Sequence, residues 1–93
     1  MLTPVHPGEI LKEEFMVPHG ISANALARTI HVPPNRVAAI VNGTRGVSAN
    51  TALRLAKVFG TTPNFWLNLQ NAYDLDAARS DLGELDMLVP VAR

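Results

Sequence analysis

Apolar residues recur along most of the chain at the three- and four-residue spacing of amphipathic helices. Five such stretches are separated by proline, glycine and capping residues. The first predicted helix follows the segment HPGE, where Pro7 suits a first helical position, and we expect it to end at Pro18 and Gly20. The second begins at Ser22, a residue type that caps helices. The residues that share one apolar face are Ile10, Leu11, Phe15 and Met16 in the first helix and Leu26, Ala27 and Ile30 in the second.

Two consecutive prolines separate the second apolar stretch from the third. A residue before proline is pushed out of helical dihedral angles, so Pro33 fits an N-cap position. Pro34 then fits the first helical position, where a missing N–H costs nothing. The pair therefore predicts the start of a third helix, which Gly43 ends. In this helix Val37, Ile40 and Val41 face inward, Asn35, Ala39 and Asn42 face outward, and Arg36 lies at the edge of the outward face.

Two further helices and a tail complete the pattern. We expect a fourth helix from its cap at Ser48 to about Phe59, and a fifth from its cap at Thr62 to about Arg79. The inward residues of the fourth are Ala52, Leu53, Leu55, Ala56 and Phe59, with Arg54 and Lys57 exposed. Pro90 limits the last apolar stretch, MLVPV, to an edge strand or a tail. The predicted fold class is therefore all-α, with five helices and a short C-terminal tail.

The composition narrows the class of protein. A chain of 93 residues with 47% hydrophobic and 17% charged residues is long enough for one core, which predicts a single domain over residues 1–93. There is no cysteine, which excludes disulfide and thiol chemistry. The N-terminal segment lacks the basic and apolar parts of a signal peptide, and no apolar run reaches the roughly 18 residues of a membrane span. We therefore expect a cytoplasmic protein.

Charge is unevenly distributed, although the formal net charge is zero. Residues 15–73 hold five basic residues and no acidic residue, whereas residues 1–14 and 74–93 carry net charges of −2 and −3. The basic residues of the middle segment are Arg28, Arg36, Arg45, Arg54 and Lys57. A basic middle is typical of a surface that binds a polyanion, and the acidic flanks would suit a different, basic partner.

The second and third helices are short and joined by the segment HVP, so they must cross steeply. This is the helix-turn-helix arrangement, in which the second helix enters the major groove of DNA. We expect it at about residues 22–43, within a region of about 8–60. Asn35 can pair with adenine, and Arg36 can reach guanine or a phosphate. His31 stands in the turn where glycine is usual, and we assign it a structural role because histidine tolerates left-handed dihedral angles.

Aromatic residues gather in the fifth helix. Phe65, Trp66 and Tyr73 are more typical of a core or an oligomer interface than of a cofactor site. Two-fold pairing of the chain would place two recognition helices one duplex turn apart, about 34 Å. We therefore take residues 61–93, with these three aromatic residues, as the candidate dimer interface.

The segments NALA, NGTRG, TALRLA and FWLNLQ, in this order, resemble the Cro/C1-type (Xre) helix-turn-helix family. With HPGEILKEEF in front and FWLNLQNAYDL behind, the chain is similar to the HigA-type antitoxins of type II toxin–antitoxin modules, over about residues 6–76. The resemblance implies a five-helix, lambda repressor-like fold and a homodimer that binds a palindromic operator in its own promoter. It also implies a HigB-type toxin partner, an mRNA-cleaving nuclease, and neither catalysis nor a cofactor or metal in this chain.

The resemblance also implies roles for individual residues. Pro34 cannot donate a backbone hydrogen bond to a base, which shifts base reading toward its neighbours. The candidates for base readout are Pro34, Asn35, Arg36 and Ala39. The candidates for phosphate contact are Ser22, Asn24, Asn42, Thr44 and Arg45, helped by backbone N–H groups of the segment VNGTR.

Other functions stay open from the sequence. The nearest alternative is a stand-alone Xre-family regulator without a toxin. An enzyme is disfavoured, since the three histidines stand 13 and 12 residues apart, which is not metal-ligand spacing, and NGTRG lacks the lysine of a P-loop. A helical module that binds only proteins would lack the steep salt dependence of DNA binding.

Overall fold

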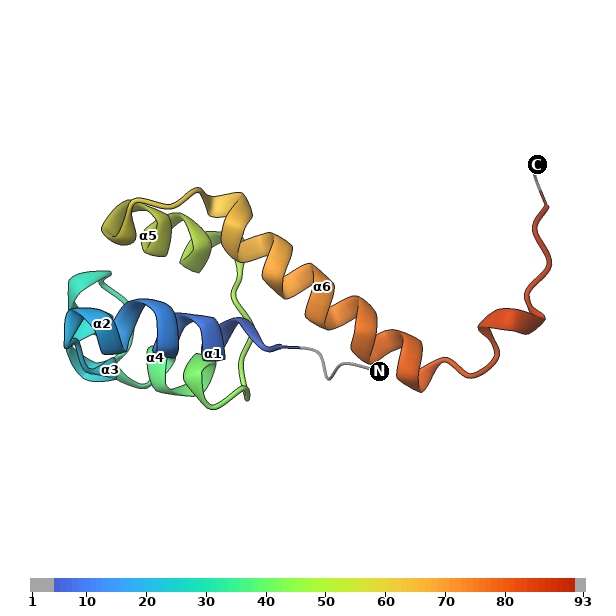
Figure 1. The fold of residues 1–93 in the computed structure, drawn as a ribbon, viewed down its shortest axis with the longest axis horizontal. Helices are drawn as coiled ribbons and strands as arrows, with labels where there is room; N and C mark the ends of the chain where they lie inside the picture. The colour runs from blue at the N-terminus through green and yellow to red at the C-terminus, as the bar shows by residue number, and fades with distance from the viewer. Residues whose placement is uncertain (1–4, 92–93) are drawn as a thin grey trace.

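The computed structural model describes residues 5–91 and contains five helices, with no strand in that range (Figure 1). The first helix is continuous and consists of α1 (Pro7–Ile10), the π-helical η1 (Leu11–Met16) and α2 (Val17–His19). The others are α3 (Ala23–Thr29), α4 (Pro34–Val41), α5 (Ala49–Phe59) and α6 (Pro63–Asp81), and a 3-10 turn, η2 (Leu85–Met87), lies in the tail. The all-α, five-helix prediction is confirmed. Residues 1–4 and 92–93, with Arg93 of the acidic C-terminal segment, lie outside the described residues.

Capping residues set most helix boundaries where the sequence predicts them. The hydroxyl oxygens of Ser22, Ser48 and Thr62 each accept a hydrogen bond from the backbone N–H three residues later, at 3.1, 3.3 and 3.1 Å. Gly20 and Gly60 close the first helix and α5 with φ angles of 62° and 72°. Glycine adopts these left-handed angles at little cost.

Pro18 does not end the first helix, contrary to the sequence-based expectation. It lies inside α2, and the helix continues to His19. The preceding stretch is π-helical, and the Val17 N–H donates to the Lys12 carbonyl, five residues back. This wider turn leaves more room for a proline ring than an α turn does. The His19 ring donates through Nδ1 to the Phe15 carbonyl at 2.7 Å, which adds a hydrogen bond in the last turn of this helix.

The core lies where the first helix, α3, α4, α5 and the start of α6 meet. Trp66 is its largest fully buried side chain, and its Nε1–H donates to the Thr61 hydroxyl at 2.8 Å. α3 packs on α4, α5 packs on α6, and α1 contacts both α4 and α6. The fully buried apolar side chains around Trp66 are Leu11, Leu26, Val37, Ile40 and Leu55.

The burial of three side chains, Leu53, Arg54 and Trp66, differs from the prediction. Leu53 was expected to face inward but is 60% exposed, whereas Arg54 was expected on the exposed face but is partly buried. Helical periodicity marks the apolar side of α5, but it does not reveal how much of that side the neighbouring helices cover. Trp66 is fully buried within its own chain and offers no surface to a second copy. Phe65 and Tyr73 therefore remain as aromatic interface candidates.

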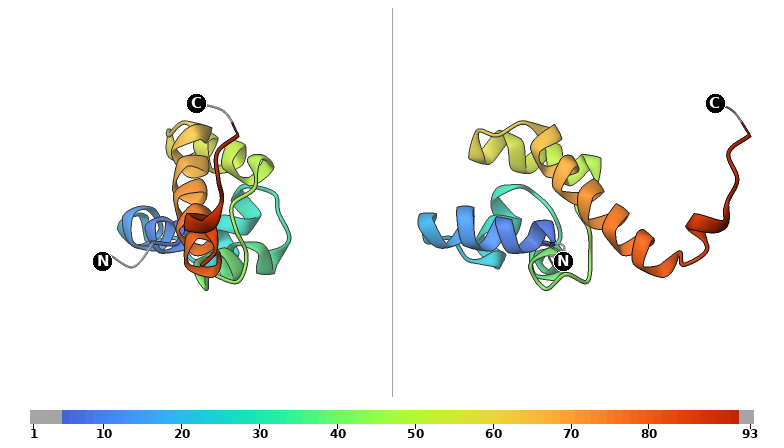
Figure 2. Two further views of the ribbon diagram at one scale, coloured as in Figure 1. Left: turned by 90° about the vertical axis from the view of Figure 1, so that its right-hand side faces the viewer. Right: turned by 45° about the vertical axis from the view of Figure 1, so that its right-hand side comes forward.

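The second half of α6 and the tail project from the other helices. The described chain measures 49 × 23 × 22 Å, and the tail lies at the opposite end of the long axis from α5 (Figures 1 and 2). Residues 74–91 are exposed apart from Asp76, which is partly exposed. This projecting segment is consequently free to contact another molecule.

Glycine at position 8 is required by the contact between α1 and α4. A Cβ atom on Gly8 would lie 1.8 Å from the Ile40 carbonyl oxygen and 2.9 Å from the Val41 Cα. These atoms are backbone of α4, so they cannot turn aside as a side chain can. His6, two residues before Gly8, caps α1, because its Nδ1 accepts a hydrogen bond from the Gly8 N–H at 2.9 Å. The His6 ring also packs edge-on against the Tyr73 ring, with 4.8 Å between the ring centroids.

We expect Gly8→Ala to lower the free energy of unfolding by about 3 kcal/mol, because the methyl group would push α1 away from α4. Chemical denaturation monitored by circular dichroism measures this change. Gly83→Ala is the matched control, since nothing lies within 4 Å of a Cβ at Gly83, and it should change stability by less than about 0.5 kcal/mol. Equal effects of the two substitutions would contradict the steric argument.

Candidate nucleic-acid interface

The turn between α3 and α4 has the left-handed geometry that the sequence indicates. His31 has a φ of 59°, the one positive φ among the described residues other than glycine, which confirms its structural role. The Val32 N–H donates to the Ala27 carbonyl at 3.0 Å and so closes the end of α3. Pro33 follows as the N-cap of α4, with ψ of 147°, and Pro34 is the first helical residue, as predicted.

The outward face of α4 is small, polar and free of acidic residues. Val37 and Ile40 are buried, which fixes the rotation of α4 and turns the opposite side outward. The candidates for base readout lie on the outward side or at the exposed tip. Pro34 and Asn35 are exposed, and Arg36 and Ala39 are partly exposed. A helix with this face fits the major groove, about 12 Å wide.

The loop after α4 uses its backbone donors internally. The Ala39 carbonyl accepts hydrogen bonds from the Thr44 N–H at 3.0 Å, the Thr44 hydroxyl at 3.1 Å and the Arg45 N–H at 3.2 Å. The Gly43 N–H donates to the Ile40 carbonyl. These contacts contradict the expectation that backbone N–H groups of this loop are available for phosphate. The exposed side chains of Asn42 and Arg45 remain available, whereas Thr44 has already committed its hydroxyl hydrogen.

The start of α3 presents the other two phosphate candidates. Ser22 and Asn24 are exposed. The Ser22 oxygen accepts the Ala25 N–H, which leaves its own hydroxyl hydrogen available to an anion. Both residues stand at the positive end of the α3 dipole.

Cations of the basic middle segment have no carboxylate partner within residues 5–91. In this range one ion pair forms, between Arg79 and Asp76 at 3.1 Å, and it lies in the distal half of α6. Arg28 and Arg45 are exposed, and Arg36 is partly exposed. Their charge is therefore not neutralised by acidic groups in the described part of the chain, which favours attraction of a polyanion.

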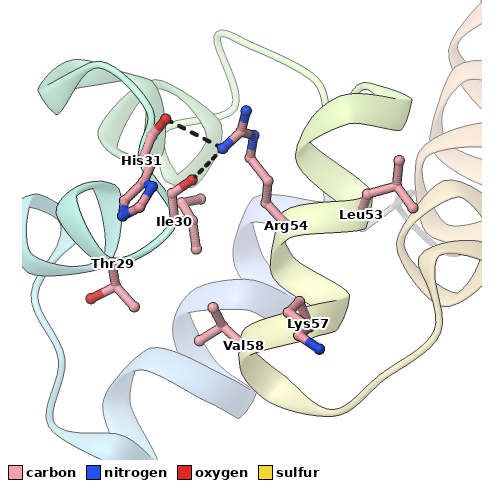
Figure 3. A pocket seen from close by; sticks show the side chains of 7 residues that line it. All are labelled: Thr29, Ile30, His31, Leu53, Arg54, Lys57 and Val58. Carbon is pink, nitrogen blue, oxygen red and sulfur yellow. Dashed lines mark hydrogen bonds between the residues drawn. The ribbon is translucent and has the colours of Figure 1, made fainter.

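Arg54 is a positioning residue that the sequence analysis missed. Its Nη1 donates to the carbonyls of Ile30 at 2.8 Å and His31 at 3.4 Å (Figure 3). Its Nε donates to Asn50 Oδ1 at 2.8 Å. Pro33 and Pro34 have no N–H with which to satisfy the carbonyls of the turn. The double proline was therefore the available signal that a side chain elsewhere must donate to this turn.

Gln70 of α6 holds the loop that precedes α5. Its Oε1 accepts the Val47 N–H at 2.7 Å, and its Nε2 donates to Asp74 at 2.9 Å. A Cβ on Gly46 would lie 2.9 Å from Gln70 Oε1, so the loop passes close to this side chain. The segment that carries Arg45 is thus positioned by α6 as well as by α4.

Residues 5–91 contain neither a metal-binding cluster nor a membrane-spanning helix. No three His, Asp or Glu side chains in this range gather closely enough to hold a metal ion. No helix in the same range is long and apolar enough to cross a membrane.

Comparison with known proteins gives consistent matches. The profile of the helix-turn-helix family HTH_3 matches residues 11–66. The antitoxin HigA-1 of Vibrio cholerae is 49% identical over 77% of this chain and 68% of its own length. The chain spans between 64% and 82% of the length of the first curated relatives that it matches.

Solved structures agree over nearly the whole chain. An addiction module antidote protein of the HigA family from Coxiella burnetii is 53% identical, with a TM-score of 0.89 over 96% of this chain and 99% of that one. The antitoxin HigA of Pseudomonas aeruginosa, solved with the higBA promoter, is 42% identical, with a TM-score of 0.90 over 96% of this chain and 99% of that one.

We expect Arg54→Met to lower the free energy of unfolding by about 1–2 kcal/mol, because the turn carbonyls lose their donor. Lys57→Met is the control, since it removes the same charge from an exposed position one turn away on α5. It should change stability by less than about 0.5 kcal/mol. Urea denaturation of both variants measures the difference. A loss that is the same for both would mean that Arg54 acts through its charge and not through the turn.

Proposed function

The chain belongs to the helix-turn-helix family and, within it, to the HigA-type antitoxins, and from this premise we propose that it represses its own operon as a DNA-binding dimer. We further propose that it binds and neutralises a HigB-type, mRNA-cleaving toxin, and that it acts in the cytoplasm, where DNA and mRNA are both accessible. The observation that carries the proposal is the acid-free outward face of α4. The Pseudomonas relative solved with promoter DNA supports it.

In this proposal α4 reads the operator from the major groove. Asn35 and Arg36 make the direct contacts to base edges, because amide and guanidinium groups match the donors and acceptors of adenine and guanine. Pro34 and Ala39 contribute close apolar contact. Ser22, Asn24, Asn42 and Arg45 hold the phosphates on either side, with a smaller part for Thr44.

Dimerisation through residues 61–93 completes the DNA-binding unit. One chain presents one recognition helix, and a palindromic operator needs two, about 34 Å apart. The projecting half of α6 and the tail are long and exposed enough to join two copies. Phe65 and Tyr73 contribute from the start and the middle of α6.

The toxin interaction rests on charge. A nuclease that grips RNA carries a basic surface, and the acidic N-terminal segment of this chain offers a complementary one. Glu9, Glu13 and Glu14 are all exposed on the first helix. Co-purification with the product of the adjacent gene, followed by a gel shift on the operon's promoter, tests both halves of the proposal. Promoter binding without any co-purifying toxin would favour the stand-alone regulator.

We expect Arg36→Ala to weaken operator binding by about 1–3 kcal/mol, or roughly 5- to 150-fold, and to leave binding to unrelated duplexes nearly unchanged. The reason is that base contacts discriminate sequence whereas phosphate contacts do not. Fluorescence anisotropy with operator and scrambled duplexes measures both affinities.

Lys12→Ala is the control for this substitution, because Lys12 is exposed on the first helix, outside the proposed DNA and dimer contacts. It should leave both affinities unchanged. If Arg36→Ala weakens both duplexes equally and reduces the salt dependence by about one phosphate contact, Arg36 binds a phosphate and the direct-readout assignment is wrong.

We expect the triple variant Glu9→Gln, Glu13→Gln, Glu14→Gln to slow association with the toxin about tenfold at low salt, because exposed charges act mainly on the encounter rate. Operator affinity should not fall. Surface plasmon resonance with immobilised toxin gives the rates. The parallel variant Asp81→Asn, Glu84→Gln, Asp86→Asn shows whether the C-terminal acidic segment contributes, and an unchanged rate in both variants would refute the charge hypothesis.

A further inference from the structure

A pocket of about 280 Å³ lies between the end of α3 and the outer side of α5 (Figure 3). Its wall is mostly apolar, and its volume is at the lower end of the range for small-molecule sites. Leu53 and Val58 are 60% and 41% exposed there, so two large apolar side chains of the same pocket face solvent. Two cations, Arg54 and Lys57, stand at the same place.

The C-terminal tail, residues 82–91, is apolar like the pocket but carries acidic residues where the pocket carries basic ones. Its apolar side chains lie outside the core and are largely exposed, with Met87 80% exposed. Acidic residues lie beside them, since Glu84 and Asp86 are in the tail and Asp81 ends α6 just before it. The exposed apolar residues of the tail are Leu82, Leu85, Met87, Leu88, Val89 and Val91. Such a segment is an incomplete interface until something covers it.

We propose that the tail of one copy docks in the α3–α5 pocket of a second copy, and that the exchange is reciprocal. This inference rests on the proposed dimer and names the surface that receives the tail. The apolar side chains of the tail would cover Leu53 and Val58. The acidic groups beside them would face Arg54 and Lys57. A reciprocal exchange has two-fold symmetry and closes at two copies.

The dimensions suit this exchange. The 19 residues of α6 span about 28 Å, and the residues from 82 to 91 reach at most about 33 Å when extended. These lengths bridge two DNA-binding units about 34 Å apart. To fill its own pocket the tail would have to turn back along α6, because tail and α5 lie at opposite ends of the molecule (Figures 1 and 2).

Other occupants match the pocket less well. A basic nuclease would be repelled by Arg54 and Lys57. A DNA phosphate would gain nothing from Leu53 and Val58, because burying apolar surface against a charged group is unfavourable. An acidic and apolar segment satisfies both parts of the pocket, and the tail is such a segment in the same chain.

Crosslinking tests the proposal, and the absence of cysteine in the chain gives a clean background. Chains that carry Leu53→Cys are mixed with chains that carry Met87→Cys and oxidised with diamide. We expect a disulfide-linked mixed dimer, because the two Cα atoms must approach within about 7 Å for the bond to form. Val17→Cys replaces Leu53→Cys as the control, since Val17 is also 60% exposed but lies outside the pocket.

Each outcome decides the proposal. A mixed dimer with Leu53→Cys and none with Val17→Cys supports it, whereas equal crosslinking of both overturns it. An intramolecular disulfide in a chain with both Leu53→Cys and Met87→Cys, without mixed dimers, shows self-docking and overturns it. Light scattering on the unmodified chain separates the failures. A dimer that does not crosslink refutes only this docking site, whereas a monomer on operator DNA also refutes the dimer of the proposed function.

A second variant gives an independent measure. Leu53→Asp places a like charge against the acidic tail on a side chain that is already mostly exposed, so folding should be preserved. We expect the dimer dissociation constant to rise at least about tenfold. Leu53→Lys should raise it less, because the lysine attracts the tail. Identical dissociation constants for the two variants would contradict the predicted charge of the occupant.

Discussion

The absence of any space between Gly8 and the Ile40 carbonyl determines where α4 lies. Two helix backbones meet there directly, and this contact tolerates no side chain and little displacement. The same helix is held at its start by the Arg54 guanidinium, which bonds the turn before it, and at its end by the internal hydrogen bonds to Ala39. A helix fixed at both ends and along its length presents its outward residues at defined positions, as base readout in a groove requires.

α6 connects this fixed unit to the rest of the molecule. Its first turns contribute Trp66 to the core, and its middle contributes Gln70 to the loop before α5 and Tyr73 to the ring of His6. A displacement of α6 would therefore also displace the loop that carries Arg45 and the start of the first helix. A partner bound to the projecting half would therefore contact the same helix that positions this loop and the first helix through hydrogen bonds and packing.

Local rules were enough to predict the helices and the face of α4. The double proline, the serine and threonine caps and the spacing of Val37 and Ile40 act within a few residues of one another, so the sequence displays them. The role of Arg54 could not be found in this way, because its acceptors lie 23 and 24 residues away in the chain. The predictions for Pro18, for Leu53 and for Trp66 as an interface residue were wrong for the same reason. Whether a proline is tolerated, or an apolar side chain is covered, depends on neighbours that only the folded chain brings together.

The projecting half of α6 has a consequence for how this protein can change over generations. Residues 74–81 are exposed apart from Asp76, which is partly exposed, so substitutions there bring no clash and open no cavity in the core. In the proposed function, the dimer surface on this half of α6 is consequently encoded in a stretch of sequence separate from the one that faces DNA. Mutation can alter the choice of protein partner while the preferred operator stays the same. Related modules in one genome can therefore diverge in one specificity at a time, which limits interference between them.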